Sequence, residues 1–144
     1  MISASRRRHH YTYDARNRPT LKNFVDTGTP DVATSYYADG AVQSITQGPV
    51  TLSYEYDKLR KLTRERLQHG TIDWLTQHTY NTHGDAAYLT YPDGGSIAFA
   101  PNALGQATQA GAFATGATYF PNGALKQFTY AGQDVPMPRR AGCP

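Results

Sequence analysis

Apolar and polar residues alternate over several short stretches of this chain. Tyr54 and Tyr56 flank Glu55, and the same two-residue period places every second residue from Trp74 to Tyr80 on one face of a strand. Helical spacing is nearly absent. The one candidate helix, over residues 58–69, has no clear cap and alternates as well as it coils, so we predict a turn followed by a strand there. The pattern therefore predicts an all-β protein built from short strands.

Strings rich in Gly, Pro, Asn and Asp separate the predicted strands, as expected for tight turns. One set of strings recurs: Tyr13-Asp14-Ala15-Arg16-Asn17, Tyr36-Tyr37-Ala38-Asp39-Gly40, Tyr56-Asp57-Lys58-Leu59-Arg60, Tyr80-Asn81-Thr82-His83-Gly84, Pro101-Asn102-Ala103-Leu104-Gly105 and Tyr119-Phe120-Pro121-Asn122-Gly123. We call the last residue of each string its anchor. Successive anchors are 23, 20, 24, 21 and 18 residues apart, so six units of similar length fill the chain.

Each position of the recurring string has a physical role. The anchor must take a left-handed backbone conformation, which Gly does freely and Asn tolerably, whereas Arg60 is a departure that carries strain. Asp or Asn three residues before the anchor can accept a hydrogen bond from the backbone two residues on, and this type occurs at Asp14, Asp57, Asn81 and Asn102. The residue four before the anchor is Tyr in five units, and the residue two after it is mostly apolar, so the two are expected to meet across a hairpin.

A second set of turn strings marks the other end of each unit. These strings are Thr27-Gly28-Thr29-Pro30, Gln47-Gly48-Pro49, His69-Gly70 and Pro92-Asp93-Gly94-Gly95, with Gly111 and Gly116 further on. The expected fold is therefore a series of repetitive antiparallel β-hairpins.

Composition fits this fold and excludes several classes of protein. Tyr is abundant at 11 residues, and charged residues make up only 17% of the chain, which argues against charge-driven disorder. The longest uncharged run, residues 94–125, is broken by Pro and Gly, so no membrane span is expected. Residues 9–14 are polar where a signal peptide needs an apolar stretch. The net charge of +3 does not point to nucleic acid.

Candidate chemistry is sparse. The single Cys143 cannot close an internal disulfide, and the five His residues lack the spacing of metal ligands. No Ser lies in a nucleophile-elbow context, and most acidic residues sit in turns, where backbone capping explains them. The string Asp93-Gly94-Gly95-Ser96 lacks the Lys and the helix of a phosphate-binding loop. We therefore expect no catalytic residues, no metal and no cofactor.

One cluster suggests a binding surface instead. Lys58, Arg60, Lys61, Arg64 and Arg66 are close in sequence, with Tyr54, Tyr56 and Trp74 nearby. Exposed Tyr54 and Trp74 could stack on a carbohydrate at a cell surface, which is the competing functional hypothesis. The simpler interpretation is the charged face of one hairpin, because Glu55, Asp57 and Glu65 are interleaved with the basic residues.

Two units carry a resemblance to a known family. Tyr13-Asp14-Ala15-Arg16-Asn17-Arg18-Pro19-Thr20 and Tyr56-Asp57-Lys58-Leu59-Arg60-Lys61-Leu62-Thr63 resemble the YD repeat, Y-D-x-x-G-R-L-T, of the RHS family. Both lack the Gly, and the first also lacks the Leu. Asn102-Ala103-Leu104-Gly105-Gln106-Ala107-Thr108 keeps the same shape with substitutions. The resemblance extends over residues 11 to about 131.

The resemblance implies a fold and a role. RHS and YD-repeat proteins coil a long sheet of β-hairpins into a hollow shell, which in bacterial polymorphic toxins encloses a C-terminal toxin. The shell itself performs no catalysis. By this resemblance the chain is expected to be part of a curved or spiral RHS-type β-shell, exported in its parent protein by a specialised system to the outside or the surface of the cell. Its partners would be the remaining repeats and the toxin.

The expected organisation has three parts. Residues 1–10 form a basic N-terminal extension, residues 11–131 hold six degenerate YD repeats, and residues 132–144 form an irregular, disordered tail without turn register or strand alternation. Neither the D-P-x-G-L-like closing motif of the family nor a toxin occurs in the chain. We therefore expect a fragment of a larger protein, whose unpaired strand edges invite self-association.

Overall fold

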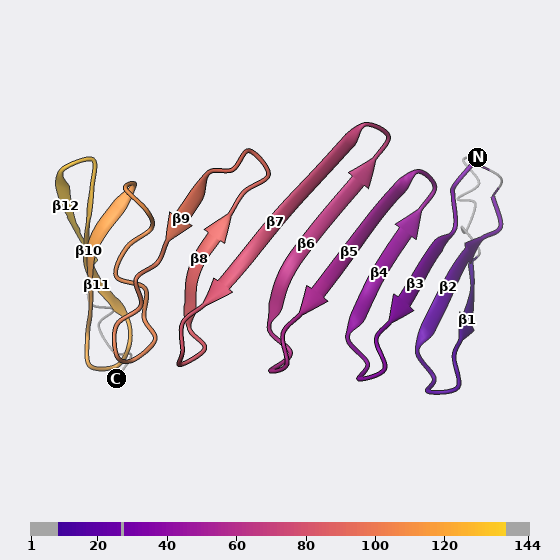
Figure 1. The fold of residues 1–144 in the computed structure, drawn as a ribbon, viewed down its shortest axis with the longest axis horizontal. Helices are drawn as coiled ribbons and strands as arrows, with labels where there is room; N and C mark the ends of the chain where they lie inside the picture. The colour runs from indigo at the N-terminus through magenta and orange to yellow at the C-terminus, as the bar shows by residue number, and fades with distance from the viewer. Residues whose placement is uncertain (1–8, 27, 138–144) are drawn as a thin grey trace, which may run out of the picture. The chain divides into compact units, whose positions relative to one another are not determined.

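The computed structural model describes residues 9–26 and 28–137, which form strands joined by turns and contain no helix (Figure 1). The strands are β1 (His9–Tyr13), β2 (Pro19–Phe24), β3 (Val32–Tyr36), β4 (Val42–Gln47), β5 (Val50–Tyr56), β6 (Leu62–His69), β7 (Ile72–Tyr80), β8 (Ala86–Thr90), β9 (Ser96–Ala98), β10 (Ala114–Tyr119), β11 (Leu125–Tyr130) and β12 (Gln133–Pro136). The predicted all-β fold of repetitive hairpins is confirmed. Residues 58–69 form the predicted turn and strand.

The backbone divides into two compact units, residues 1–75 and 76–144, and β7 crosses the division. In the first unit, each of β1 to β6 pairs antiparallel with its neighbour in the chain. In the second unit, β7, β8 and β9 pair in the same way, and β10, β11 and β12 form a separate sheet. Pairing is therefore local throughout, because each strand bonds the strand that precedes or follows it.

The strand register gives the first unit two different faces. One row of neighbours runs Thr34, Ile45, Leu52 and Leu67, whereas the adjacent row, on the opposite face, runs Ser35, Ser44, Ser53 and Arg66. Following this alternation, one face collects most of the large apolar side chains, and we call it the aromatic face. Its members include Tyr11, Tyr13, Phe24, Val32, Tyr36, Ile45, Leu52, Tyr54, Tyr56 and Leu67.

The opposite face of the first unit is polar. Hydroxyl groups bond across neighbouring strands, with 2.7 Å between the Oγ atoms of Ser35 and Ser44 and 3.4 Å between the Oγ1 atoms of Thr46 and Thr51. In a sheet of this kind the polar face can be exposed to water, whereas the apolar face has to pack against another element. Among the described residues, however, no hydrophobic side chain is buried. The described residues therefore supply no second layer that buries the aromatic face.

The strand boundaries correct the expected organisation at both ends. β1 begins at His9, inside the segment expected to be an extension, while residues 1–8 lie outside the described part. Residues 133–136 form β12 instead of an irregular tail, because Ala131 and Gly132 both take positive φ, of 49° and 77°, and reverse the chain. Ala gives little sequence signal for such a turn. Residues 138–144 lie outside the described part.

Gly116 also differs from expectation. It lies within β10 and not in a turn. Its φ is 63°, and the register between β10 and β11 shifts between Thr115 and Thr118. Gly116 therefore sits at an irregularity in a strand, which is the other common use of a Gly in a β pattern.

Candidate functional site

The recurring element of this chain is one turn geometry, which we call the capped turn. In each case the N–H of the first residue donates to the C=O of the fifth, and the N–H of the fourth donates back to the C=O of the first; in the first turn these distances are 3.0 and 2.9 Å. Among the described residues, seven turns combine these two hydrogen bonds with positive φ at the fourth residue, and we keep the name capped turn for them: Asp14–Arg18, Tyr37–Ala41, Asp57–Lys61, Asn81–Asp85, Tyr91–Gly95, Asn102–Gln106 and Phe120–Ala124. Ala110–Ala114 shares the two hydrogen bonds, but its fourth residue, Phe113, does not take positive φ. The geometry is a tight turn followed by a left-handed residue.

The fourth residue of each capped turn is the anchor, and all seven take positive φ. Five are Gly. The other two are Asn17, with φ of 59°, and Arg60, with φ of 63°. The side chain of Arg60 forms an ion pair with Asp39 of the preceding capped turn at 3.4 Å. The structure therefore places Arg60 in the strained conformation expected of an anchor.

A side-chain oxygen caps the backbone in every one of the seven turns. Where the first residue is Asp or Asn, its Oδ1 accepts from the N–H groups of the third and fifth residues; for Asn81 both distances are 2.9 Å. Asp14, Asp57 and Asn102 do the same. Where the first residue is aromatic, Asp or Asn at the third position accepts from the fifth N–H, as Asp39, Asp93 and Asn122 do. The fifth N–H thus always has a side-chain acceptor.

One of these seven turns is absent from the six aligned strings of the sequence. The Tyr91-Pro92-Asp93-Gly94 segment is expected from the sequence to be a different turn at the opposite end of a unit, and it does join β8 to β9 there. Its hydrogen bonds are nevertheless those of the capped turn. A sequence pattern could have identified this turn: an aromatic residue, then Asp or Asn two positions later and Gly three positions later. The turns that begin at Tyr37 and Phe120 have the same pattern.

The Tyr that ends the strand before a capped turn contacts the neighbouring strand of its own hairpin. In two cases its hydroxyl also contacts the preceding hairpin. Its strand partner is the residue two after the anchor, as in Tyr36 with Val42 and Tyr56 with Leu62. In addition, the hydroxyl of Tyr36 donates to the C=O of Pro19 in the preceding hairpin at 2.8 Å. The hydroxyl of Tyr119 donates to the C=O of Ala107, the equivalent position, at 2.6 Å. We call this contact the tyrosine staple.

We predict that Tyr119→Phe destabilises the second unit by about 0.5–1.5 kcal/mol, because it removes one hydrogen bond and leaves the ring in place. Chemical denaturation measures the change in free energy of unfolding. Tyr130→Phe is the matched control, since the side chain of Tyr130 is 57% exposed and makes no staple. Equal stability of the two variants would contradict a structural role for the staple.

Thr at the third position after the anchor closes the hairpin. Thr20, Thr63 and Thr108 each donate their Oγ1 hydroxyl to the C=O of the residue eight positions earlier, at 3.3, 3.1 and 2.6 Å. At Thr20 and Thr63 the register of the two strands shifts by one residue, which marks a β-bulge. The last Thr of the Y-D-x-x-G-R-L-T pattern therefore occupies a bulge and bonds the facing strand.

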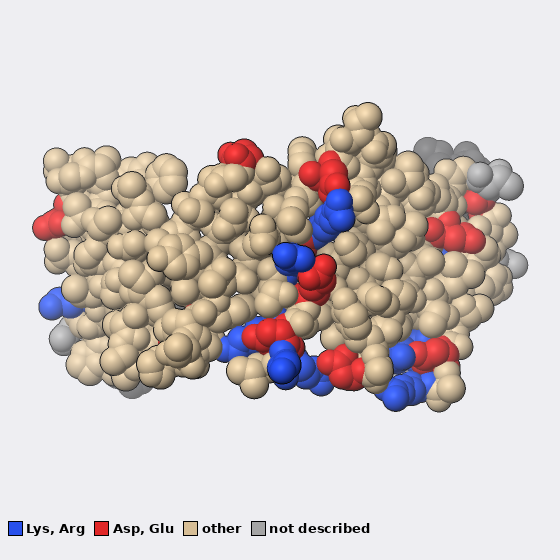
Figure 2. All heavy atoms as spheres, viewed as in Figure 1, with Lys and Arg blue, Asp and Glu red and all other residues tan. Residues whose placement is uncertain are grey.

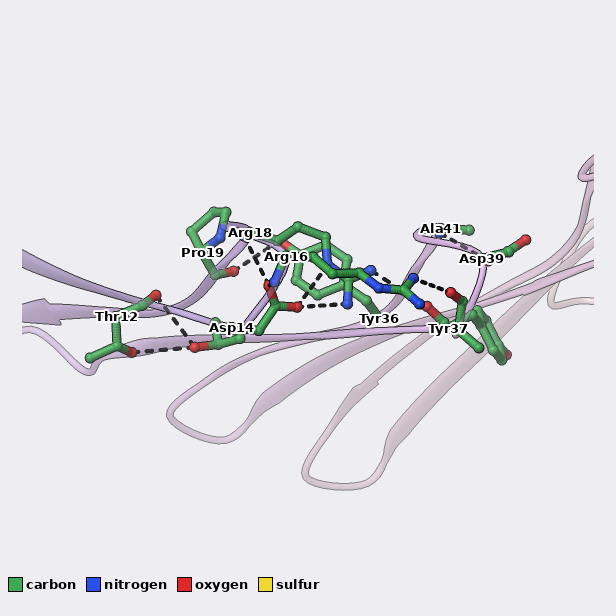
Figure 3. Close-up of polar contacts among 11 residues, drawn as sticks. Thr12, Asp14, Arg16, Arg18, Pro19, Tyr36, Tyr37, Asp39 and Ala41 are labelled. Carbon is green, nitrogen blue, oxygen red and sulfur yellow. Dashed lines mark hydrogen bonds and ion pairs between the residues drawn. The ribbon is translucent and has the colours of Figure 1, made fainter.

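Electrostatic contacts connect the first capped turn to the second (Figure 3). Arg18 forms an ion pair with Asp14 at 2.6 Å, and its guanidinium lies 4.3 Å from the ring centroid of Tyr36. Arg16 donates to the C=O of Ala38, and Arg18 approaches the C=O of Tyr37 at 3.5 Å. The side-chain hydrogen bond from Arg18, together with backbone N–H donors, holds the pKa of Asp14 below its usual range.

The lowered pKa of Asp14 predicts an acid-dependent loss of stability. A carboxyl group whose pKa falls on folding stabilises the native state above its unfolded pKa, about 3.9, and that contribution disappears as the pH falls through the lower folded pKa. The pKa of Asp73 is lowered too, because the side chain of Arg66 donates a hydrogen bond to its carboxylate. We expect Asp14→Asn to lose less stability than the unchanged chain between pH 5 and pH 2, measured by urea unfolding. If the free energy of unfolding fell by the same amount in both proteins between pH 5 and pH 2, the role assigned to Asp14 would be wrong.

The basic cluster predicted from the sequence is largely neutralised. Arg64 pairs with Glu55 at 3.3 Å, Arg66 donates its Nε to Asp73 at 2.6 Å, and Arg60 pairs with Asp39. Most charged side chains lie on the first unit. The visible surface of the second unit is almost entirely uncharged (Figure 2). Its described residues include only four charged side chains, Asp85, Asp93, Lys126 and Asp134. Three of the five basic residues of the cluster therefore form ion pairs between neighbouring strands and turns.

The two residues expected to stack on carbohydrate lie on different strands. Tyr54 belongs to β5 and is partly buried, which together with nearby Glu65 raises the pKa of its hydroxyl. Trp74 belongs to β7, and its side chain is 56% exposed. A groove that the sequence did not indicate, of about 510 Å³, lies between the second and third capped turns and is lined by Tyr37, Asp39, Glu55, Tyr56 and their neighbours.

Over the described residues, no group of three or more His, Cys, Asp or Glu side chains is arranged to hold a metal ion. A search of the same residues finds no helix of the length and apolarity that a membrane crossing requires. No protein-family model and no curated protein sequence matches the chain. The fold and the seven capped turns define a class, the repetitive β-hairpin proteins, and the chain is described at that level.

Proposed function

We propose that this chain is a non-catalytic wall segment of a larger RHS-like repeat protein. The proposal combines the resemblance to the YD repeat with one structural observation: the first unit is a single-layered sheet whose aromatic face carries no second layer among the described residues. A sheet with one polar and one apolar side is stable when the apolar side is covered. In a shell, that cover is supplied by enclosed polypeptide.

The repeat geometry supports a scaffold role over a catalytic one. The Asp and Asn side chains of the capped turns bond backbone N–H groups, and the Arg side chains of the first unit pair with carboxylates or carbonyls. These groups stabilise the individual hairpins, and other polar contacts, from Arg16 to the C=O of Ala38 and between Arg60 and Asp39, join one hairpin to the next. We propose that the enclosed partner is a C-terminal toxin of the parent protein, which a specialised export system carries out of a bacterial cell or to its surface.

The size of the native polypeptide tests this proposal. An antibody raised against residues 9–137 is used to isolate the protein from its source cells, and peptides from the product are sequenced by mass spectrometry. We expect a polypeptide much larger than 15.9 kDa that holds further capped-turn repeats. Recovery of only a 15.9 kDa chain would overturn the proposal.

The alternative is a carbohydrate-binding module at a cell surface. The exposed ring of Trp74 and the groove between the second and third capped turns, with its Tyr rings and carboxylates, supply the stacking surfaces and acceptors that sugars use. A glycan array decides between the two functions. Saturable binding that Trp74→Ala or Tyr37→Ala abolishes would favour the module, and absence of binding would favour the wall segment.

A further inference from the structure

Strand β1 leaves one edge of the first unit unpaired among the described strands. In the first capped turn, both the N–H and the C=O of Asp14 bond within the hairpin. Because the direction of these groups alternates along an antiparallel strand, the N–H and C=O groups of His9, Tyr11 and Tyr13 point away from β2. These three residues also share the aromatic face, where Tyr11 is 43% and Tyr13 is 55% exposed.

The same edge is occupied one hairpin further on. Val32, Thr34 and Tyr36 hold the positions in β3 that His9, Tyr11 and Tyr13 hold in β1, counted from their anchors. There β2 pairs with β3, with Lys22 opposite Val32, and the Tyr36 hydroxyl reaches the C=O of Pro19. The edge of β1 therefore offers the ladder and the Tyr hydroxyl that a neighbouring antiparallel strand uses in this fold.

The other strand ends of the described sheets do not offer such an edge. In β12, the N–H of Met137 donates to the C=O of Lys126 at 2.8 Å, so the groups of Pro136 face outward, and Pro has no N–H to donate. Beyond β9, the N–H of Gly111 already donates to the C=O of Ala98 at 2.8 Å. At β10, the remaining edge strand, the N–H of Ala117 already donates to the C=O of Thr108 at 2.9 Å, and the register shifts between Thr115 and Thr118. Among the edge strands within residues 9–26 and 28–137, β1 therefore offers the most regular open antiparallel template.

We propose that two copies of this chain pair through β1. A two-fold axis at Tyr11 places Tyr11 opposite Tyr11 of the second copy, and His9 opposite Tyr13 of the second copy. All three outward-facing residues then exchange main-chain hydrogen bonds, and the aromatic rings of both copies lie on one face. By analogy with Tyr36 and Pro19, the hydroxyl of Tyr13 meets the C=O of His10 of the second copy.

This pairing closes on itself. An isologous contact uses the same strand in both copies, so it forms a dimer and not a filament. Pairing of β1 with β12 of another copy would continue indefinitely, and Pro136 opposes it. The inference concerns the 144-residue chain alone and goes beyond the proposed function: a larger parent protein could hold a further hairpin at β1, and the dimer would still form from the isolated chain.

Light scattering after size-exclusion chromatography tests the dimer with the full chain. We expect twice the mass of 15.9 kDa, and we expect Tyr11→Lys to reduce it to the monomer, because two like charges would face each other at the axis. Thr34→Lys is the matched control, since it places the same charge at the equivalent position of β3 and leaves the dimer intact. A monomeric chain, a filament, or a dimer that Tyr11→Lys does not weaken would overturn the proposal.

Cysteine crosslinking tests the register without disturbing the fold. In a Cys143→Ser background, Tyr11→Cys is expected to form a disulfide between copies, because residues directly opposite in an antiparallel pair have Cα atoms about 5.5 Å apart. His9→Cys alone is expected to form none, whereas a mixture of His9→Cys and Tyr13→Cys chains crosslinks. A disulfide between two His9→Cys chains, or the absence of a disulfide between two Tyr11→Cys chains, would show that the proposed register is wrong.

Discussion

Gly105→Val is expected to destabilise this protein more than any other single turn substitution. Gly105 is an anchor with φ of 75°, and a Cβ built there would lie 2.5 Å from Oδ1 of Asp85. Forcing a β-branched residue into the left-handed region costs about 1–3 kcal/mol, and the clash with Asp85 adds to that cost. Urea unfolding is expected to show a loss of about 3 kcal/mol or more relative to the unchanged chain.

Two matched variants separate strain from clash. Gly94 is an anchor with φ of 84°, and a Cβ added to it would meet nothing within 4 Å, so Gly94→Val carries the strain alone. Ala103→Val, in the same turn as Gly105, carries neither. The expected order of loss is Gly105, then Gly94, then Ala103, and removing the carboxylate with Asp85→Ala should recover part of the loss at Gly105. Equal losses at positions 103 and 105 would contradict the assigned turn.

Asn102→Ala is expected to have the second-largest effect. Oδ1 of Asn102 accepts from the N–H groups of Leu104 and Gln106 at 2.9 and 3.1 Å, and its amide donates to the side chain of Gln106 at 2.9 Å. Alanine leaves both N–H groups without a side-chain acceptor, much as the loss of a helix cap does. We expect the free energy of unfolding to fall by about 1–2 kcal/mol, measured by thermal or chemical denaturation.

Two controls accompany Asn102→Ala. Asn102→Asp keeps the oxygen that accepts both backbone bonds, as Asp14 and Asp57 do in their turns, and should retain most of the stability. Asn122→Ala removes one backbone bond instead of two, so it should cost less. If Asn102→Asp proved as damaging as Asn102→Ala, the backbone capping role would be wrong.

Much of the local structure could be predicted from the sequence because turn chemistry is local. Asp14, Gly40 and Gly84 lie where short-range hydrogen bonds and positive φ decide the backbone, and these constraints depend on the residue type alone. The alternation around Glu55 and Thr12 likewise reports directly on strands with two different faces. Local pairing then leaves few choices of topology, since each strand bonds its neighbour in the chain.

Contacts between hairpins were not predictable in the same way. The tyrosine staple joins Tyr36 to the backbone C=O of Pro19, 17 residues away. Because every residue has a backbone C=O, no sequence signal marks the acceptor. The turn at Ala131 and Gly132 was missed because Ala rarely takes positive φ. The groove beside Tyr37 and Tyr56 lies between the turns of two neighbouring hairpins, and the residues of neither turn indicate how the two hairpins pack together.

We propose that polypeptide covers the aromatic face of the first unit in the native protein. Photo-crosslinking in the native protein tests it, with a crosslinkable residue at Leu52 on the aromatic face and at Ser53 on the polar face as the matched control. We expect position 52 to crosslink to another segment of the parent polypeptide and position 53 not to. Equal crosslinking at both positions, or none at position 52, would contradict it.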